Sequence, residues 1–175
     1  MKKFTKIFTS TIILVFIILI LPISYIYSNA FTHVKEDKNI VETAISDGRF
    51  NTLVEALKKA DLVNTLEGKG PFTVFAPTDE AFNKLPAGTI ENLLKPENKE
   101  ALKDILLYHT AKGNLKSADI LKLDGKQLTL GNGKTATISV KNGNVYINDS
   151  KIIITDITAS NGIIHVIDAV LIPSK

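Results

Sequence analysis

The stretch 70–82, Gly-Pro-Phe-Thr-Val-Phe-Ala-Pro-Thr-Asp-Glu-Ala-Phe, constrains the fold more than any other part of this 175-residue chain. Successive side chains of a strand point to opposite faces, so residues 72–75 place apolar groups on both faces. A strand of this kind is typical of the covered centre of a sheet. Pro77 ends the strand, and Thr78 is a natural N-cap for a helix that begins at Asp79. The sequence therefore predicts a central strand that leads directly into a helix.

Two more motifs follow. The stretch 161–168, Asn-Gly-Ile-Ile-His-Val-Ile-Asp, opens on a turn dipeptide and continues as an apolar strand. Between the two stretches, Leu107-Tyr108-His109 lies at the end of the clearest amphipathic helix, predicted over 97–108. In this order, the three motifs resemble the N-terminal, central and C-terminal motifs of the fasciclin (FAS1) domain family. The resemblance extends from about residue 39 to residue 173.

The resemblance implies an α+β fold, a wedge-like and mostly antiparallel β-sandwich with helices from the N-terminal half packed against it. The hydrophobic pattern agrees, because its period changes from 3.6 to 2 after about residue 120, where Asn132-Gly133 and Asn142-Gly143 form hairpin turns. The resemblance also implies mainly structural roles for the motif residues. These are Thr73, Phe75, Ala76, Pro77, Thr78, Asp79, Phe82, Asn161, Gly162, Ile164, His165 and Val166.

Helix signals fill the first half of the chain. A first helix is predicted from residue 40, with Asn39 as a possible cap and Gly48 as the stop. A second helix is predicted from Phe50 to near Gly68, because apolar residues recur there at helical spacing. The helix 97–108 is expected to end before Gly113.

Residues 1–30 have the composition of an export signal. Lys2, Lys3 and Lys6 precede an uncharged apolar run, and Ser28-Asn29-Ala30 has the small-x-small form of a cleavage site. The alternative is an N-terminal membrane anchor, because the run is nearly long enough to span a bilayer. Both interpretations predict a secreted or cell-envelope protein. Residues 31–38 would form a lead-in, and 39–175 a single domain.

Charge and cysteine content exclude several function classes. Segment 1–30 holds three lysines and no acid, so the remaining chain has 18 basic and 18 acidic residues and no formal net charge. Arg49 is the only arginine, which argues against a nucleic acid partner. There is no cysteine, so disulfides, thiolate metal sites and a cysteine nucleophile are excluded.

No motif for catalysis or metal binding stands out. His33 is expected to be a solvated residue of the lead-in. His165 and Asp168 are three positions apart on a strand, so their side chains face opposite sides. Neither a Gly-x-Ser-x-Gly elbow nor a His-Glu-x-x-His helix is present. We therefore predict a protein that is not an enzyme, with no catalytic residue, no metal site and no cofactor.

The resemblance supplies four candidates for partner binding: Tyr108, His109, Asp156 and Ile157. Asp156-Ile157 is similar to a pair implicated in integrin recognition by animal fasciclin domains, and Tyr108-His109 is similarly tied to adhesion. In the alternative interpretation Asp156 caps a turn and Ile157 packs under the sheet edge. His109 would then pack in the core and bind helix-end carbonyls, and His165 would also be buried.

The family resemblance implies an extracellular adhesion module that contacts a cell-surface or matrix protein or glycan. The alternative is a carrier of a lipid or haem-like ligand, which would require an apolar pocket with a few polar groups. Asn148-Asp149-Ser150 also fits a glycosylation sequon, which matters only in a host that glycosylates.

Overall fold

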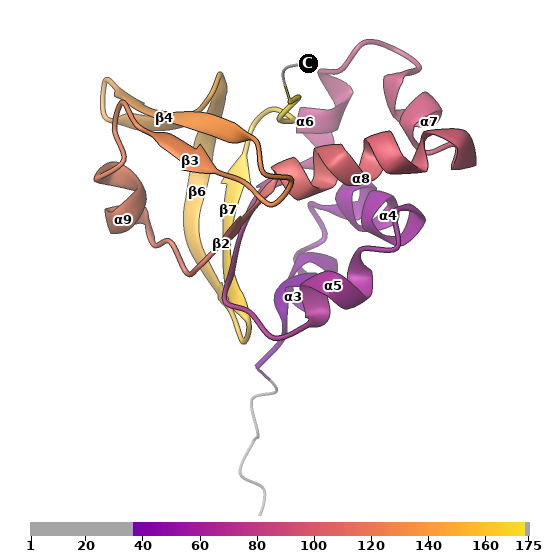
Figure 1. Cartoon of the computed structure of the whole chain (residues 1–175), viewed down its shortest axis with the longest axis horizontal. Coiled ribbons are helices and arrows are strands. Elements are labelled where there is room, and N and C mark those ends of the chain that lie inside the picture. Colours follow the sequence, from indigo (N-terminus) through magenta and orange to yellow (C-terminus); the bar gives the residue numbers. More distant parts are fainter. Residues whose placement is uncertain (1–36, 174–175) are drawn as a thin grey trace, which may run out of the picture. The chain divides into compact units, whose positions relative to one another are not determined.

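A mixed seven-stranded sheet organises residues 37–173, which are the residues that the computed structural model describes (Figure 1). These residues belong to one compact unit. The signal or anchor predicted over 1–30, and His33, lie outside the described residues. No helix within 37–173 has the length and apolar character needed to cross a membrane. The strand order is β2-β1-β7-β6-β5-β4-β3, with β1 Phe72–Pro77, β2 Thr110–Lys112, β3 Gln127–Thr129, β4 Thr135–Lys141, β5 Asn144–Ile147, β6 Ser150–Ala159 and β7 Gly162–Ile167.

Helices precede most of the strands in the described chain. In Figure 1, α4 and α8 lie on one side of β7, and β4 and α9 lie on the other. The α+β class and the mainly antiparallel pairing are therefore confirmed, with one parallel pair, β1–β7, inside the sheet. The helices are α3 Ile40–Asp47, α4 Asn51–Lys59, α5 Val63–Glu67, α6 Asp79–Asn83, α7 Thr89–Leu93, the 3₁₀ helix Pro96–Asn98, α8 Lys99–Tyr108 and α9 Ser117–Leu121.

The parallel pair β1–β7 confirms the predicted central strand. Val74 pairs with Ile164 and Phe75 pairs with His165, and all four residues are buried. Successive residues of β1 enter different cores, since Val74 belongs to a core shared with the helices and Phe75 to a core on the opposite face. The second core is completed by Tyr108, Ala111, Ile120, Leu130, Ala136, Ile138, Ile147, Ile152, Ile167 and Leu171.

Local signals predicted several element boundaries correctly. Asn39 begins α3 in a capping box with Glu42, and Gly48 ends it in the left-handed conformation. Thr78 accepts a hydrogen bond from the Ala81 N–H and caps α6. Asn142 and Gly143 have positive φ values, as a tight hairpin turn requires.

Three features differ from the sequence-based prediction. The second helix is two helices, because Asp61 adopts a left-handed φ of 53° between α4 and α5. The long helix begins at Lys99, after a 3₁₀ turn that starts at Pro96. Residues 110–112 form β2 against β1, and α9 follows; neither element was predicted.

Candidate functional site

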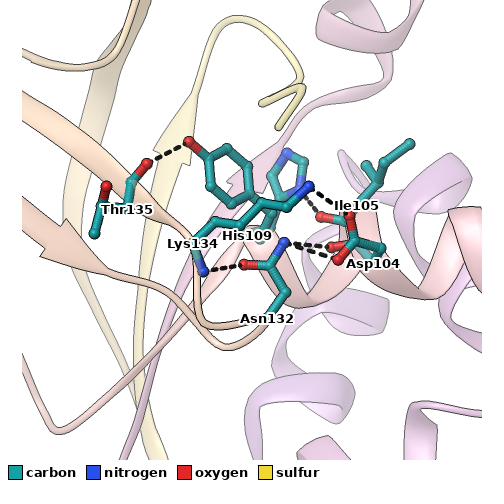
Figure 2. Close-up of polar contacts among 7 residues, drawn as sticks. Asp104, Ile105, His109, Asn132, Lys134 and Thr135 are labelled. Atoms are coloured by element: carbon teal, nitrogen blue, oxygen red, sulfur yellow. Dashed lines mark hydrogen bonds and ion pairs between the residues drawn. The ribbon is translucent and has the colours of Figure 1, made fainter. Parts of the chain in front are cut away.

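Tyr108 joins the end of α8 to the second half of the sheet. Its side chain is buried, with 2% of the residue exposed. The hydroxyl donates to the Thr135 carbonyl oxygen at 2.8 Å and accepts from Asn148 Nδ2 at 3.1 Å. Figure 2 shows the hydroxyl bond that reaches Thr135. Tyr108 therefore presents almost no side-chain surface to a protein partner in this structure.

His109 is also buried and bridges two segments. Nδ1–H donates to the Ile105 carbonyl at 2.8 Å (Figure 2), and Nε2 accepts from the Leu171 N–H at 2.9 Å. A backbone N–H can only donate, so this pair of bonds fixes the neutral imidazole with its proton on Nδ1. Burial lowers the pKa of His109 to about 4, against the opposing effect of the bond to Ile105. These contacts match the structural interpretation of His109.

A polar cluster at the β3–β4 turn fastens the hairpin to α8. Asn132 Nδ2 donates to Asp104 Oδ1 at 3.0 Å, and Asn132 Oδ1 accepts from the Lys134 N–H at 3.1 Å. Lys134 Nζ lies 3.4 Å from Asp104 Oδ2 (Figure 2). Together with Tyr108, this cluster fixes the hairpin against the helix.

His165 holds the loop that follows β2. Its Nε2–H donates to the Leu115 carbonyl at 2.7 Å, and Nδ1 accepts from the Asp156 N–H at 3.3 Å. Burial lowers the pKa of His165, which favours this neutral form. Thr73 Oγ1 donates to the Gly113 carbonyl at 2.8 Å and accepts from the Leu115 N–H at 2.9 Å. Two motif residues on neighbouring strands thus position the same loop.

The Asp156 carboxylate caps α9 from across the fold. Oδ1 accepts from the Ser117 N–H at 2.9 Å, and Oδ2 accepts from the Ser117 hydroxyl. Asp156 has a left-handed φ of 62°, in a stretch of β6 where its register with β7 shifts. Sequence reasoning missed the proximity of Asp156 to His165, because it depends on the pairing of β6 with β7.

Two exposed isoleucines precede Asp156 on β6. Ile153 is 47% exposed and Ile154 is 38% exposed, whereas Ile157 is half-buried against the helix-side core. β5 pairs with only Ser150 and Lys151 of the ten-residue strand β6, and no other described strand pairs along that edge. We call residues 153–157 the β6 patch. Ile153 and Ile154 were not among the predicted site residues.

An enclosed apolar pocket lies between α4, α6, α7 and α8. Its volume is about 10 Å³, and Phe82, Leu94 and Leu102 are among its lining residues. This space is comparable to one water molecule, so it would have to open widely to admit a lipid or a haem. Within residues 37–173, no group of three or more His, Asp or Glu side chains is arranged to hold a metal ion.

The other motif residues shape the junction of β1 and β7. Asn161 Oδ1 accepts from the Ile40 N–H at 3.0 Å, and Asn161 Nδ2 donates to the Leu66 carbonyl at 2.7 Å. At Gly162 an added Cβ would lie 2.1 Å from the Phe72 carbonyl oxygen, so only glycine fits this close approach. Asp79 caps α4, as its carboxylate accepts from the Thr52 N–H at 2.7 Å. Phe82, Ala76 and Val166 pack in the helix-side core.

Comparison with known proteins identifies the family. A family model described as the Fasciclin domain matches residues 48–173. This chain belongs to the fasciclin domain family. The recognition made from the three sequence motifs is therefore confirmed.

Bacterial and animal proteins share this fasciclin domain. The chain is 50% identical to "Protein sll1483" of Synechocystis over 134 residues, which cover 77% of the chain and 73% of that protein. It is 32% identical to the "Immunogenic protein MPT70" of Mycobacterium tuberculosis, with 77% of the chain and 68% of that protein covered. It is 39% identical to pig "Transforming growth factor-beta-induced protein ig-h3", but covers only 19% of that longer protein.

A solved structure is similar in fold. The FAS1 domain pair of the insect cell adhesion molecule fasciclin I superposes with a TM-score of 0.68 and 22% identity. The match covers 78% of this chain and 51% of the insect chain. This similarity confirms the FAS1 fold of the domain.

Proposed function

We propose that this chain is an exported, non-enzymatic binding module of the fasciclin type that mediates adhesion at the cell surface or in the extracellular matrix. The insect relative in fold is a cell adhesion molecule. The export signal predicted over 1–30 supports a secreted or cell-envelope location. The partner is proposed to be a cell-surface or matrix protein or glycan.

The observation that carries the proposal is the β6 patch. Ile153 and Ile154 are adjacent and exposed, and the strand edge beside them is unpaired beyond Lys151. Exposed apolar side chains next to an open strand edge favour contact with another molecule. Tyr108 and His109 would act indirectly, because both are buried and hold the surrounding segments in place.

Asp156 and Ile157 are proposed to support the patch in different ways. The Asp156 carboxylate fixes α9, so its loss would loosen the surface beside the patch. Ile157 anchors the C-terminal end of the patch in the helix-side core.

The test is binding of the chain, purified from the extracytoplasmic fraction, to cells and to plates coated with matrix proteins. We expect the double variant Ile153→Ser/Ile154→Ser to lose most of its binding and keep its melting temperature, since exposed substitutions rarely change stability by more than about 0.5 kcal/mol. Ile45→Ser is the matched control, because Ile45 is 54% exposed on α3, outside the patch.

Two results would contradict the proposal. If the wild-type chain binds neither cells nor matrix proteins, the adhesion function fails. If the double variant and Ile45→Ser bind equally well, the β6 patch is not the contact surface.

A further inference from the structure

A groove of about 770 Å³ crosses the sheet next to the C-terminal segment. Strand β4 contributes Thr135, Thr137, Ser139 and Lys141, which are alternate residues of one strand. The groove volume lies within the range of about 300–1,000 Å³ that is typical of ligand sites. The other lining residues are Tyr108, Gln127, Asn148, Asp149, Ser150, Val170, Leu171 and Ile172.

The serine and threonine hydroxyls in this groove are free to bind a ligand, whereas the Tyr108 hydroxyl is already bonded. Within the described chain, no protein hydrogen bond involves the hydroxyl groups of Thr135, Thr137, Ser139 or Ser150. The Gln127 carboxamide is likewise without a bond to another described residue. Each hydroxyl can donate one hydrogen bond and accept others, so the wall offers a row of neutral donors and acceptors.

The floor of the groove is fixed by the contacts of Asn148. Its Oδ1 accepts from the Thr137 N–H at 2.9 Å, and its Nδ2 donates to the Tyr108 hydroxyl. The Asn148 N–H also donates to the Thr137 carbonyl at 2.8 Å. The groove is therefore largely preformed, which reduces the entropic cost of binding.

The part of the lining that comes from the segment after β7 is apolar. Val170 and Leu171 belong to it, and Ile172 is 53% exposed at its side. Tyr146 pairs with Ser139 across β4 and β5, so its ring lies on the same face of the sheet, with Lys141 Nζ 5.9 Å from the ring centre. A ligand in this groove would meet hydroxyl and amide groups from the strands and their turns, and aliphatic groups from the segment after β7.

We propose that this groove binds a neutral saccharide chain. A pyranose ring carries hydroxyl groups around its edge and C–H groups on its faces, which matches these two kinds of lining group. Phosphorylated or nucleic acid ligands fit poorly, because among the described lining residues the single cation, Lys141, is accompanied by the acid Asp149. The inference rests on the proposed function as a binding module and gives one of its partners a chemical class and a site.

The experiment is an NMR titration of the purified chain with four probes: cellohexaose, chitohexaose, xylohexaose and mannohexaose. We expect at least one probe to shift the backbone amides of residues 135–141 and 148–150. Thr137→Val and Ser139→Ala should each weaken that binding by roughly tenfold, because each removes a hydroxyl from the groove. Thr129→Val is the matched control, since Thr129 is an exposed threonine on the neighbouring strand β3 outside the groove lining.

The inference is overturned if none of the probes shifts these amides at millimolar concentration, or if the shifts map to the β6 patch. It is also overturned if Thr129→Val weakens binding as much as Thr137→Val does. Adhesion is measured separately with the Ile153→Ser/Ile154→Ser variant. Saccharide binding without adhesion would refute only the adhesion function, and adhesion without saccharide binding would refute only the groove.

Discussion

Nε2 of His109 accepts a 2.9 Å hydrogen bond from the backbone N–H of Leu171, which lies 62 positions further along the chain. The bond joins the end of α8 to the segment that follows β7. It exists only while the imidazole is neutral, because a protonated Nε2 would become a second donor facing the Leu171 N–H.

This relationship predicts a fold that loses stability in mild acid. The imidazole has an ordinary pKa of 6.5 in the unfolded chain, and a pKa of about 4 in the folded protein. The unfolded state therefore binds more protons between these values. The stabilisation is complete above about pH 6.5 and falls as the pH is lowered. The loss reaches about 3 kcal/mol once the pH is below the folded pKa.

The measurement is urea unfolding followed by circular dichroism from pH 7.5 to pH 4, since the chain has no tryptophan. His109→Phe should be less stable at pH 7.5 but less sensitive to pH than the wild type. A residual slope is expected because burial also lowers the pKa of His165. An unchanged slope in His109→Phe would show that His109 is not the responsible group.

Asp79 caps helix α4 from outside that helix, and we predict that its loss destabilises the fold. Phe50 at the N-cap of α4 makes no side-chain cap bond, and the Asp79 carboxylate bonds the N–H groups of Asn51 and Thr52 instead. We expect Asp79→Ala to cost about 1 kcal/mol of unfolding free energy. Glu80→Ala is the control, since Glu80 shares the first turn of α6. If both variants lose the same unfolding free energy, Asp79 acts only through its negative charge in the first turn of α6 and not as a cap of α4.

The Asp79 cap also has a pH signature. Partial burial raises the pKa of this carboxyl, but the hydrogen bonds from Thr52 and Asn51 lower it by more, so the net shift is downward. The cap is therefore fully present above the ordinary pKa of 3.8 and is lost as the pH falls below it. Asp79→Ala should lose part of the wild-type decline in stability below about pH 4.

A comparison of Asn148 with Asn142 distinguishes the energetic cost of backbone strain from the contribution of side-chain hydrogen bonds. Both have a φ of 51°, but only Asn148 bonds the Tyr108 hydroxyl and the Thr137 N–H through its side chain. Asn142→Ala should cost about 1 kcal/mol, as expected for alanine in a left-handed conformation. Asn148→Ala should cost roughly 1 to 2 kcal/mol more. Thermal unfolding measures the difference, and equal values would show that the side-chain bonds contribute nothing.

The close packing around Gly162 predicts that adding one methyl group there strongly lowers the stability of the fold. The added carbon would overlap the Phe72 carbonyl oxygen across the parallel pair of strands. We expect Gly162→Ala to lower the unfolding free energy by roughly 2 to 3 kcal/mol. In the control Gly68→Ala, the nearest atom would lie 3.2 Å away, so the loss should be much smaller. Similar denaturation midpoints for the two variants would contradict the close approach.

The sequence predicted features that depend on neighbouring residues. The Asn39 cap, the Thr78 cap and the turn at Asn142-Gly143 each depend on residues no more than three positions apart. The alternation of residues 72–75 also predicted that β1 is covered on both faces. Strand β2 has only three residues, which are too few for a periodic pattern. It also follows α8 closely, so the helical pattern dominated that part of the sequence.

The candidate site was harder to predict because its contacts join distant residues. Asp156 reaches Ser117 and His165 only after β6 and β7 have paired. The exposure of Ile153 results from the short overlap between β5 and β6, which the apolar run 152–154 does not reveal. The groove likewise needs the C-terminal segment as a wall, so no local motif indicated it.

The parallel pair β1–β7 also sets when this protein can complete its fold. β1 ends at Pro77, whereas β7 spans Gly162–Ile167, so the middle of the sheet forms only after nearly the whole domain has been synthesised. Until then, one edge of β1 has no neighbour and both cores lack a wall. A nascent chain would therefore complete both cores only late in translation.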